Sequence, residues 1–77
     1  MKIRIQLFGI LAEHLPKSSK GKGEVDLDHG SNIKDLLDLV GIKRNVAFAV
    51  NGDHDLDKDH PLQTGDEVLV FTAVSGG

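Results

Sequence analysis

A single amphipathic helix pattern lies between segments with the alternating pattern of strands, and this order limits what the chain can fold into. Ile3, Ile5 and Leu7 alternate with polar residues, as on a strand with one buried face. The expected strands cover residues 2–8, 24–28, 46–50 and 67–73, with a further short strand at 54–57. Because two strands precede the helix and others follow it, without a repeat or a dividing linker, the sequence predicts one α+β domain over residues 1–77. Its sheet would have four to five strands, with the helix across one face.

The main helix is expected to begin at Ser31, a good N-cap residue, and to end at Gly41. Its apolar residues recur at helical spacing and form one stripe that can pack on the sheet: Ile33, Leu36, Leu37 and Val40. A shorter helix is expected over residues 10–15, because Pro16 disfavours helical backbone at the residue before it. Residues 17–23 are small, charged and glycine-broken, which predicts an exposed loop.

The composition is that of a small globular protein with a slight excess of acidic residues. A chain of 77 residues with 39% apolar residues can form a core worth only about 3–5 kcal/mol net, which leaves little for an elaborate enclosed active site. Twelve acidic residues outnumber nine basic ones, and the basic cluster of Lys17, Lys20 and Lys22 lacks aromatic neighbours that could stack on bases. Nucleic acid is therefore not an expected partner.

The chain contains no cysteine, which excludes disulfides, thiolate metal sites and thiol catalysis. No apolar stretch approaches membrane-spanning length, and residues 1–4 alternate charge and hydrophobe instead of opening an apolar leader. We therefore expect a cytoplasmic protein without a membrane partner.

Apolar side chains are also expected on the sheet face away from the helix. If Val68, Val70 and Thr72 face the helix, then Leu69, Phe71 and Ala73 face away from it. Phe8 has the same outward parity on the first strand. An apolar group on a solvated face is typical of a surface that a partner covers. The alternative is that Phe8 and Phe71 only cover the edge of the core, since single exposed hydrophobic residues are common.

The last residues, Ser75-Gly76-Gly77, follow the final predicted strand and are expected to form a flexible tail over residues 74–77. Glycine lacks a Cβ atom, so this segment could lie extended in a narrow channel with the Gly77 carboxylate accessible. That carboxylate is ionised at neutral pH and could attack a nucleotide α-phosphate to give an acyl-adenylate, which a sulfur nucleophile could convert to a thiocarboxylate. Considered alone, a pair of glycines is better explained as a frayed terminus, because chain ends are often small and disordered.

Several motifs together carry a resemblance to a known family. They are Phe8, Leu11, Glu13, Leu15 and Pro16, the run from His60 to Val68 (HPLQTGDEV), and the ending Val74-Ser75-Gly76-Gly77. At this spacing they resemble the ubiquitin-like sulfur carriers, which include the small subunit of molybdopterin synthase and the sulfur carrier of thiamine biosynthesis. The resemblance spans essentially the whole chain and implies a β-grasp fold with a mixed sheet.

The resemblance implies that a ubiquitin-activating-type enzyme adenylates Gly77, that the carboxylate becomes a thiocarboxylate, and that an acceptor enzyme receives the sulfur. Gly77 would carry the sulfur, and Gly76 with Ser75 would thread the partner's channel. The expected partner-binding residues are Phe8, Leu69, Phe71 and Leu62. The chain would bind no cofactor, because the adenylating enzyme uses the ATP, and it would be a co-substrate or non-catalytic subunit without a complete catalytic site.

The region from Phe8 to Pro16 and the ending Val-Ser-Gly-Gly look more like the molybdopterin synthase small subunit than the thiamine carrier. The acceptor would then be the large subunit of molybdopterin synthase, and thiazole synthase is the alternative. Ala12 stands where the family often has arginine, so carriers for tungsten cofactors, thiamine or protein modification stay open. A non-catalytic docking module is the rival from another class, and it would tolerate loss of Gly77.

Two other kinds of site are poorly supported. Alternating aspartates from Asp53 resemble the start of a calcium loop, but Lys58 stands where such a loop needs glycine and Thr64 where it needs glutamate. The four histidines form no pair with metal-ligand spacing on a helix, so no metal site is expected. The serines have no glycine-framed nucleophile turn, which argues against a hydrolase.

Overall fold

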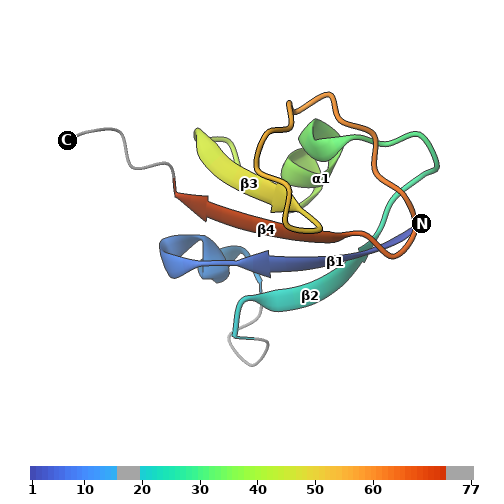
Figure 1. Ribbon diagram of the computed structural model, residues 1–77. Coiled ribbons are helices and arrows are strands. Elements are labelled where there is room, and N and C mark those ends of the chain that lie inside the picture. The colour runs from blue at the N-terminus through green and yellow to red at the C-terminus, as the bar shows by residue number, and fades with distance from the viewer. Residues whose placement is uncertain (16–19, 73–77) are drawn as a thin grey trace.

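The computed structural model describes residues 1–15 and 20–72, which form a four-stranded sheet with an α-helix packed on one face (Figure 1). In chain order the elements are β1 (Lys2–Leu7), the 3₁₀ helix η1 (Gly9–His14), β2 (Lys22–Asp26), α1 (Ile33–Leu39), β3 (Val46–Val50) and β4 (Glu67–Thr72). The α+β prediction is therefore confirmed. No helix within these residues is long and apolar enough to cross a membrane.

The strand order is β2-β1-β4-β3, so the first and last strands are neighbours in the middle of the sheet. β1 and β4 run parallel, and each pairs antiparallel with an outer strand, β2 or β3. The sheet is therefore mixed, as the family resemblance implied. Parallel pairing also places the carboxyl ends of β1 and β4 at the same end of the molecule (Figure 1).

Alternation along the strands determines which side chains form the core. Ile3, Ile5 and Leu7 of β1 are at most 3% exposed, and Val68 and Val70 of β4 at most 1%. They pack with the helix residues Ile33, Leu36 and Leu37. The predicted inward parity of both strands is thus confirmed, except that Thr72, at the end of β4, is exposed.

The N-cap of α1 is Asn32, one residue later than the predicted Ser31. The Asn32 side chain accepts a hydrogen bond from the Asp35 amide at 2.9 Å, and the Asp35 carboxylate accepts one from the Asn32 amide at 3.1 Å. This reciprocal capping box satisfies two amides that the first helical turn would otherwise leave unpaired. It therefore determines where the helix begins.

The predicted short strand at residues 54–57 is wrong. β3 ends in a turn at Asn51 and Gly52, both with positive φ, and only an isolated bridge joins Val50 to Asp53. The Asp53 carboxylate then accepts a hydrogen bond from the Asp55 amide at 2.9 Å. This local side-chain bond takes an amide that a sheet ladder would use, so the segment continues as a loop.

A polar network fixes the start of β4 against the end of β3. The Asn51 side-chain amide donates to one Asp66 carboxylate oxygen at 3.0 Å, and the Gln63 backbone amide donates to the other at 2.8 Å. The Glu67 amide donates in turn to the Asn51 side-chain oxygen at 3.0 Å. The turn before β4 is therefore tied to the β3 turn, which fixes the register that places Leu69 and Phe71 outward.

Candidate docking site at the carboxyl end of the central strands

The candidate site lies where β1 and β4 end side by side. After Leu7 the chain turns into η1, and the Phe8 amide donates a hydrogen bond to the Val70 carbonyl at 3.0 Å. That bond holds the start of η1 beside the last residues of β4. Residues 73–77 follow β4 directly, so whatever binds them comes close to this end of the sheet.

Three aromatic rings, Phe8, Phe71 and His54, form a contiguous cluster here, which we call the aromatic cluster. The Phe8 and Phe71 rings meet edge to face with centroids 6.4 Å apart and planes inclined by 70°. His54, from the loop after β3, lies 6.0 Å from Phe71. Phe8 is 40% exposed, whereas Phe71 is half-buried between its neighbours. The cluster therefore presents apolar surface next to the point where the chain leaves the sheet.

The structure places the other two expected partner-binding residues differently. Leu69 is half-buried on the outer face, opposite Gln6 of β1 and Ala49 of β3 in the register. Leu62 is only 3% exposed and belongs to the core, and its amide donates to the Ser31 carbonyl at 2.9 Å. Leu62 is therefore a core residue that leaves little surface for a partner to contact.

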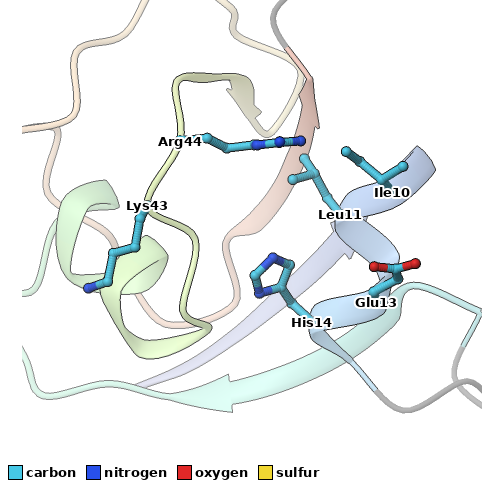
Figure 2. Close-up of a pocket in the computed structure, with 6 residues that line it drawn as sticks. All are labelled: Ile10, Leu11, Glu13, His14, Lys43 and Arg44. Atoms are coloured by element: carbon cyan, nitrogen blue, oxygen red, sulfur yellow. The ribbon is translucent and has the colours of Figure 1, made fainter.

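A shallow pocket of about 320 Å³ adjoins the site, between η1 and the loop that precedes β3 (Figure 2). Its lining residues are Ile10, Leu11, Glu13, His14, Lys43 and Arg44. Leu11 forms the floor and is 1% exposed, whereas Ile10 is 57% exposed. His14 Nδ1 lies 3.0 Å from the Val40 carbonyl oxygen, which joins η1 to the end of α1. The pocket is thus open, partly apolar and bordered by two cations.

The sequence predicts no surface role for Ile10 or Arg44, and it gives His54 only a place in the expected strand at 54–57 and among the four histidines. Ile10 belongs to the expected short helix over residues 10–15, and in the structure this helix is a 3₁₀ turn that leaves Ile10 57% exposed while Leu11 is 1% exposed. Arg44 stands in a loop without a motif. Their proximity comes from the fold and has no signal in the sequence.

The predicted tail residues Ser75, Gly76 and Gly77 lie outside the described residues, as does the whole predicted tail 74–77. Within residues 1–15 and 20–72, no three His, Asp or Glu side chains come together as a potential metal site. The aspartates after Asp53 lie exposed along the loop that approaches α1.

Comparison with known proteins gives a family and several similar folds. The model of the ThiS family matches residues 5–77. SAMP1 from Haloferax volcanii is 26% identical, with all of both chains covered and a TM-score of 0.74. A putative molybdopterin converting factor subunit 1 from Pyrococcus furiosus is 22% identical over 96% of this chain and 99% of that one, with a TM-score of 0.77.

A chain from the complex of subunits 1 and 2 of the molybdopterin-converting factor of Helicobacter pylori is 19% identical over the full length of both chains, with a TM-score of 0.65. The search of curated proteins found no match. The two molybdopterin-converting factor structures are less than 25% identical to this chain and therefore support only its fold. Membership of a family rests on the match to the family model. Since that model covers nearly the whole sequence, including the segment after β4, the chain belongs to the ThiS family of ubiquitin-like sulfur carriers with the β-grasp fold.

Proposed function

We propose that this chain is a sulfur carrier that works through the Gly77 carboxylate, as the small subunit of molybdopterin synthase in molybdenum cofactor biosynthesis. The observation that carries the proposal is the family match over residues 5–77, which includes Gly76 and Gly77. The position of the exposed Phe8 beside the end of β4 supports it, because a partner that takes the following residues would contact this ring. The proposal requires Gly77 to be the last residue of the mature protein.

The proposed chemistry begins with the ionised α-carboxylate of Gly77, whose reference pKa is about 3.3–3.7. One carboxylate oxygen attacks the α-phosphorus of ATP and pyrophosphate leaves, which gives an acyl-adenylate. A sulfur nucleophile then attacks the Gly77 carbonyl carbon and AMP leaves with the bonding electrons. With hydrosulfide as that nucleophile, loss of its proton leaves a thiocarboxylate that can pass its sulfur to the acceptor.

The residues of this chain contribute recognition to that sequence of steps. The aromatic cluster offers a rigid apolar contact, and contacts of this kind at the centre of an interface commonly dominate its binding energy. Gly76 and Ser75 would enter the enzyme's channel, where the absence of a Cβ atom at Gly76 lets the backbone pass close to the walls. The adenylating and acceptor enzymes would supply the ATP site and catalytic groups, and the need for ATP is consistent with action in the cytoplasm.

The acceptor we propose is the large subunit of molybdopterin synthase. The similar fold of a chain from the Helicobacter pylori complex of molybdopterin-converting factor subunits 1 and 2 supports this choice. Thiazole synthase, the acceptor in thiamine synthesis, is the alternative from the same carrier class. A second role, as a ubiquitin-like protein modifier, is favoured by the 26% identity to SAMP1, which is described as a small archaeal modifier protein.

The experiment is intact-mass analysis after incubation with ATP, a sulfide source and an adenylating enzyme from the same organism. We expect the full chain to gain the mass of one sulfur-for-oxygen exchange and the variant lacking Gly77 to stay unchanged. Adding the large subunit of molybdopterin synthase should discharge the sulfur, and thiazole synthase should not. Lysine conjugates without a thiocarboxylate would favour the modifier. If the mass of the full chain stays unchanged although the enzyme is active on another carrier, the carrier function is contradicted. The remaining explanation is then a non-catalytic docking module.

A further inference from the structure

Arg44 borders the pocket between η1 and the loop that precedes β3. Figure 2 shows its side chain extending from the loop before β3 across the pocket, toward Leu11 and Ile10 of η1. Lys43, the preceding residue, points the other way, and its Nζ lies 3.6 Å from the Asp38 carboxylate of α1. Of the two cations that border the pocket, Arg44 alone extends over its apolar side.

Within residues 1–15 and 20–72, no carboxylate lies within ion-pair distance of the Arg44 guanidinium. The one acidic residue that lines the pocket is Glu13, whose carboxylate points away from Arg44 (Figure 2). By contrast, Arg4 on the outer face of the sheet lies 3.9 Å from Glu67, and Lys43 has Asp38. Arg44 therefore keeps its donors available in a chain whose net charge is −3.

Apolar side chains lie on one side of Arg44, where Ile10 and Leu11 line the pocket that it borders. Three large apolar side chains are exposed within the described residues, and two of them, Phe8 and Ile10, lie at the start of η1. A partner that covers both also passes over the pocket that Ile10 and Arg44 line together. Covering an arginine without a carboxylate partner leaves a desolvated, unpaired charge, which is strongly unfavourable. The partner surface must then supply an acidic group at this point.

We propose that Arg44 and Ile10 form a second contact for the enzyme that adenylates Gly77. In this contact an aspartate or glutamate of that enzyme pairs with the Arg44 guanidinium, and an apolar side chain beside it covers Ile10. Guanidinium binds a carboxylate through two parallel hydrogen bonds, so the contact would fix the orientation of the carrier as well as its affinity. The inference rests on the proposed function, because it names the partner of the same site.

The test is ATP–pyrophosphate exchange by the adenylating enzyme, measured as a function of carrier concentration. Arg44→Glu should raise KM for the carrier at least about tenfold with little change in kcat, because a paired charge becomes a repulsion. Arg44→Lys keeps the charge without the planar fork and should give an intermediate KM. The matched control is Lys2→Glu, which makes the same change in net charge. Lys2 is the first residue of β1, and the candidate site lies at the carboxyl end of that strand. Circular dichroism establishes that all variants are folded.

The outcomes separate the two proposals. Equal KM values for Arg44→Glu and Lys2→Glu, with wild type active, would overturn the contact and leave the carrier function intact. If Arg44→Glu impairs only the delivery of sulfur, Arg44 contacts the acceptor enzyme instead of the adenylating enzyme. If Arg44→Glu abolishes self-association measured by sedimentation, Arg44 contacts a second copy of this chain. Either result overturns the inference. Absence of both exchange and thiocarboxylate with the wild type contradicts the proposed function itself.

Discussion

The Phe8 and Phe71 rings meet edge to face at 6.4 Å, and the Phe8 amide is hydrogen-bonded to the residue before Phe71, Val70, at 3.0 Å. A backbone bond and a ring contact thus hold together two residues from opposite ends of the sequence. Because the first ring is fixed by η1 and the second by β4, their apolar surface is formed before any partner arrives. Binding would then cost little side-chain entropy.

Replacing Phe71 by alanine should weaken binding of the adenylating enzyme by about 2 kcal/mol, since truncating a central aromatic contact commonly costs that much. The edge-to-face contact with Phe8 contributes about 0.5–1.5 kcal/mol to stability, so the variant should stay folded. Isothermal titration calorimetry measures the first quantity and urea unfolding the second. Leu39→Ala, which truncates an exposed apolar side chain of α1 outside the aromatic cluster, is the control. Equal affinity for both variants would remove Phe71 from the interface.

Asn32→Ala should lower the free energy of unfolding by about 1 kcal/mol, because it removes the side-chain acceptor of the capping box. Ser31→Ala should change it by less than about 0.5 kcal/mol, because Ser31 precedes the cap. Chemical unfolding of both variants, followed by circular dichroism, makes the comparison. A larger loss for Ser31→Ala would contradict the helix start described here.

Leu62→Ala should destabilise the fold by about 2–5 kcal/mol, the usual cost of truncating a buried leucine. The side chain is 3% exposed, so the effect comes from the core. At a temperature where the variant is folded, its affinity for the adenylating enzyme should match that of the wild type. Thermal unfolding and calorimetry on the same sample separate the two effects. Unchanged stability with reduced affinity would restore Leu62 to the interface.

Gly21→Ala should destabilise the protein by about 3 kcal/mol or more, a loss of the size that strain at a special backbone position can cause. The added Cβ would clash with the Leu7 carbonyl oxygen, and φ at Gly21 is +81°. Gly30 also has a positive φ, +90°, but open space around it, so Gly30→Ala should cost only about 1–2 kcal/mol. Urea unfolding of the pair isolates the steric clash from the backbone strain. Similar losses for both would show that the backbone near Leu7 can shift.

The core was predictable because burial follows simple periodicities. Ile5 and Val68 have the inward parity of their strands, and Leu36 lies on the apolar stripe of the helix, so each position could be assigned from its neighbours. The helix start was off by one residue because Ser31 and Asn32 are both good N-caps. Asp35, three residues after Asn32, decides between them through the capping box.

Periodicity could predict neither the absence of the fifth strand nor the pocket. Residues 54–57 alternate acidic side chains, yet the Asp53 carboxylate competes for the Asp55 amide, and periodicity does not register that bond. Arg44 and Ile10 are distant in sequence and meet only because η1 and the loop before β3 fold to the same end of the sheet. The tail motif was readable from the sequence, and its chemistry stays a prediction.

The central place of β4 has a mechanical consequence. The strand is hydrogen-bonded along its length to β1 on one side and β3 on the other. Tension applied to its carboxyl end along the strand axis therefore loads both ladders in shear, with many bonds resisting together, instead of peeling one bond at a time as at an outer strand. An enzyme could therefore pull on the segment after Thr72 while the domain that it holds stays folded.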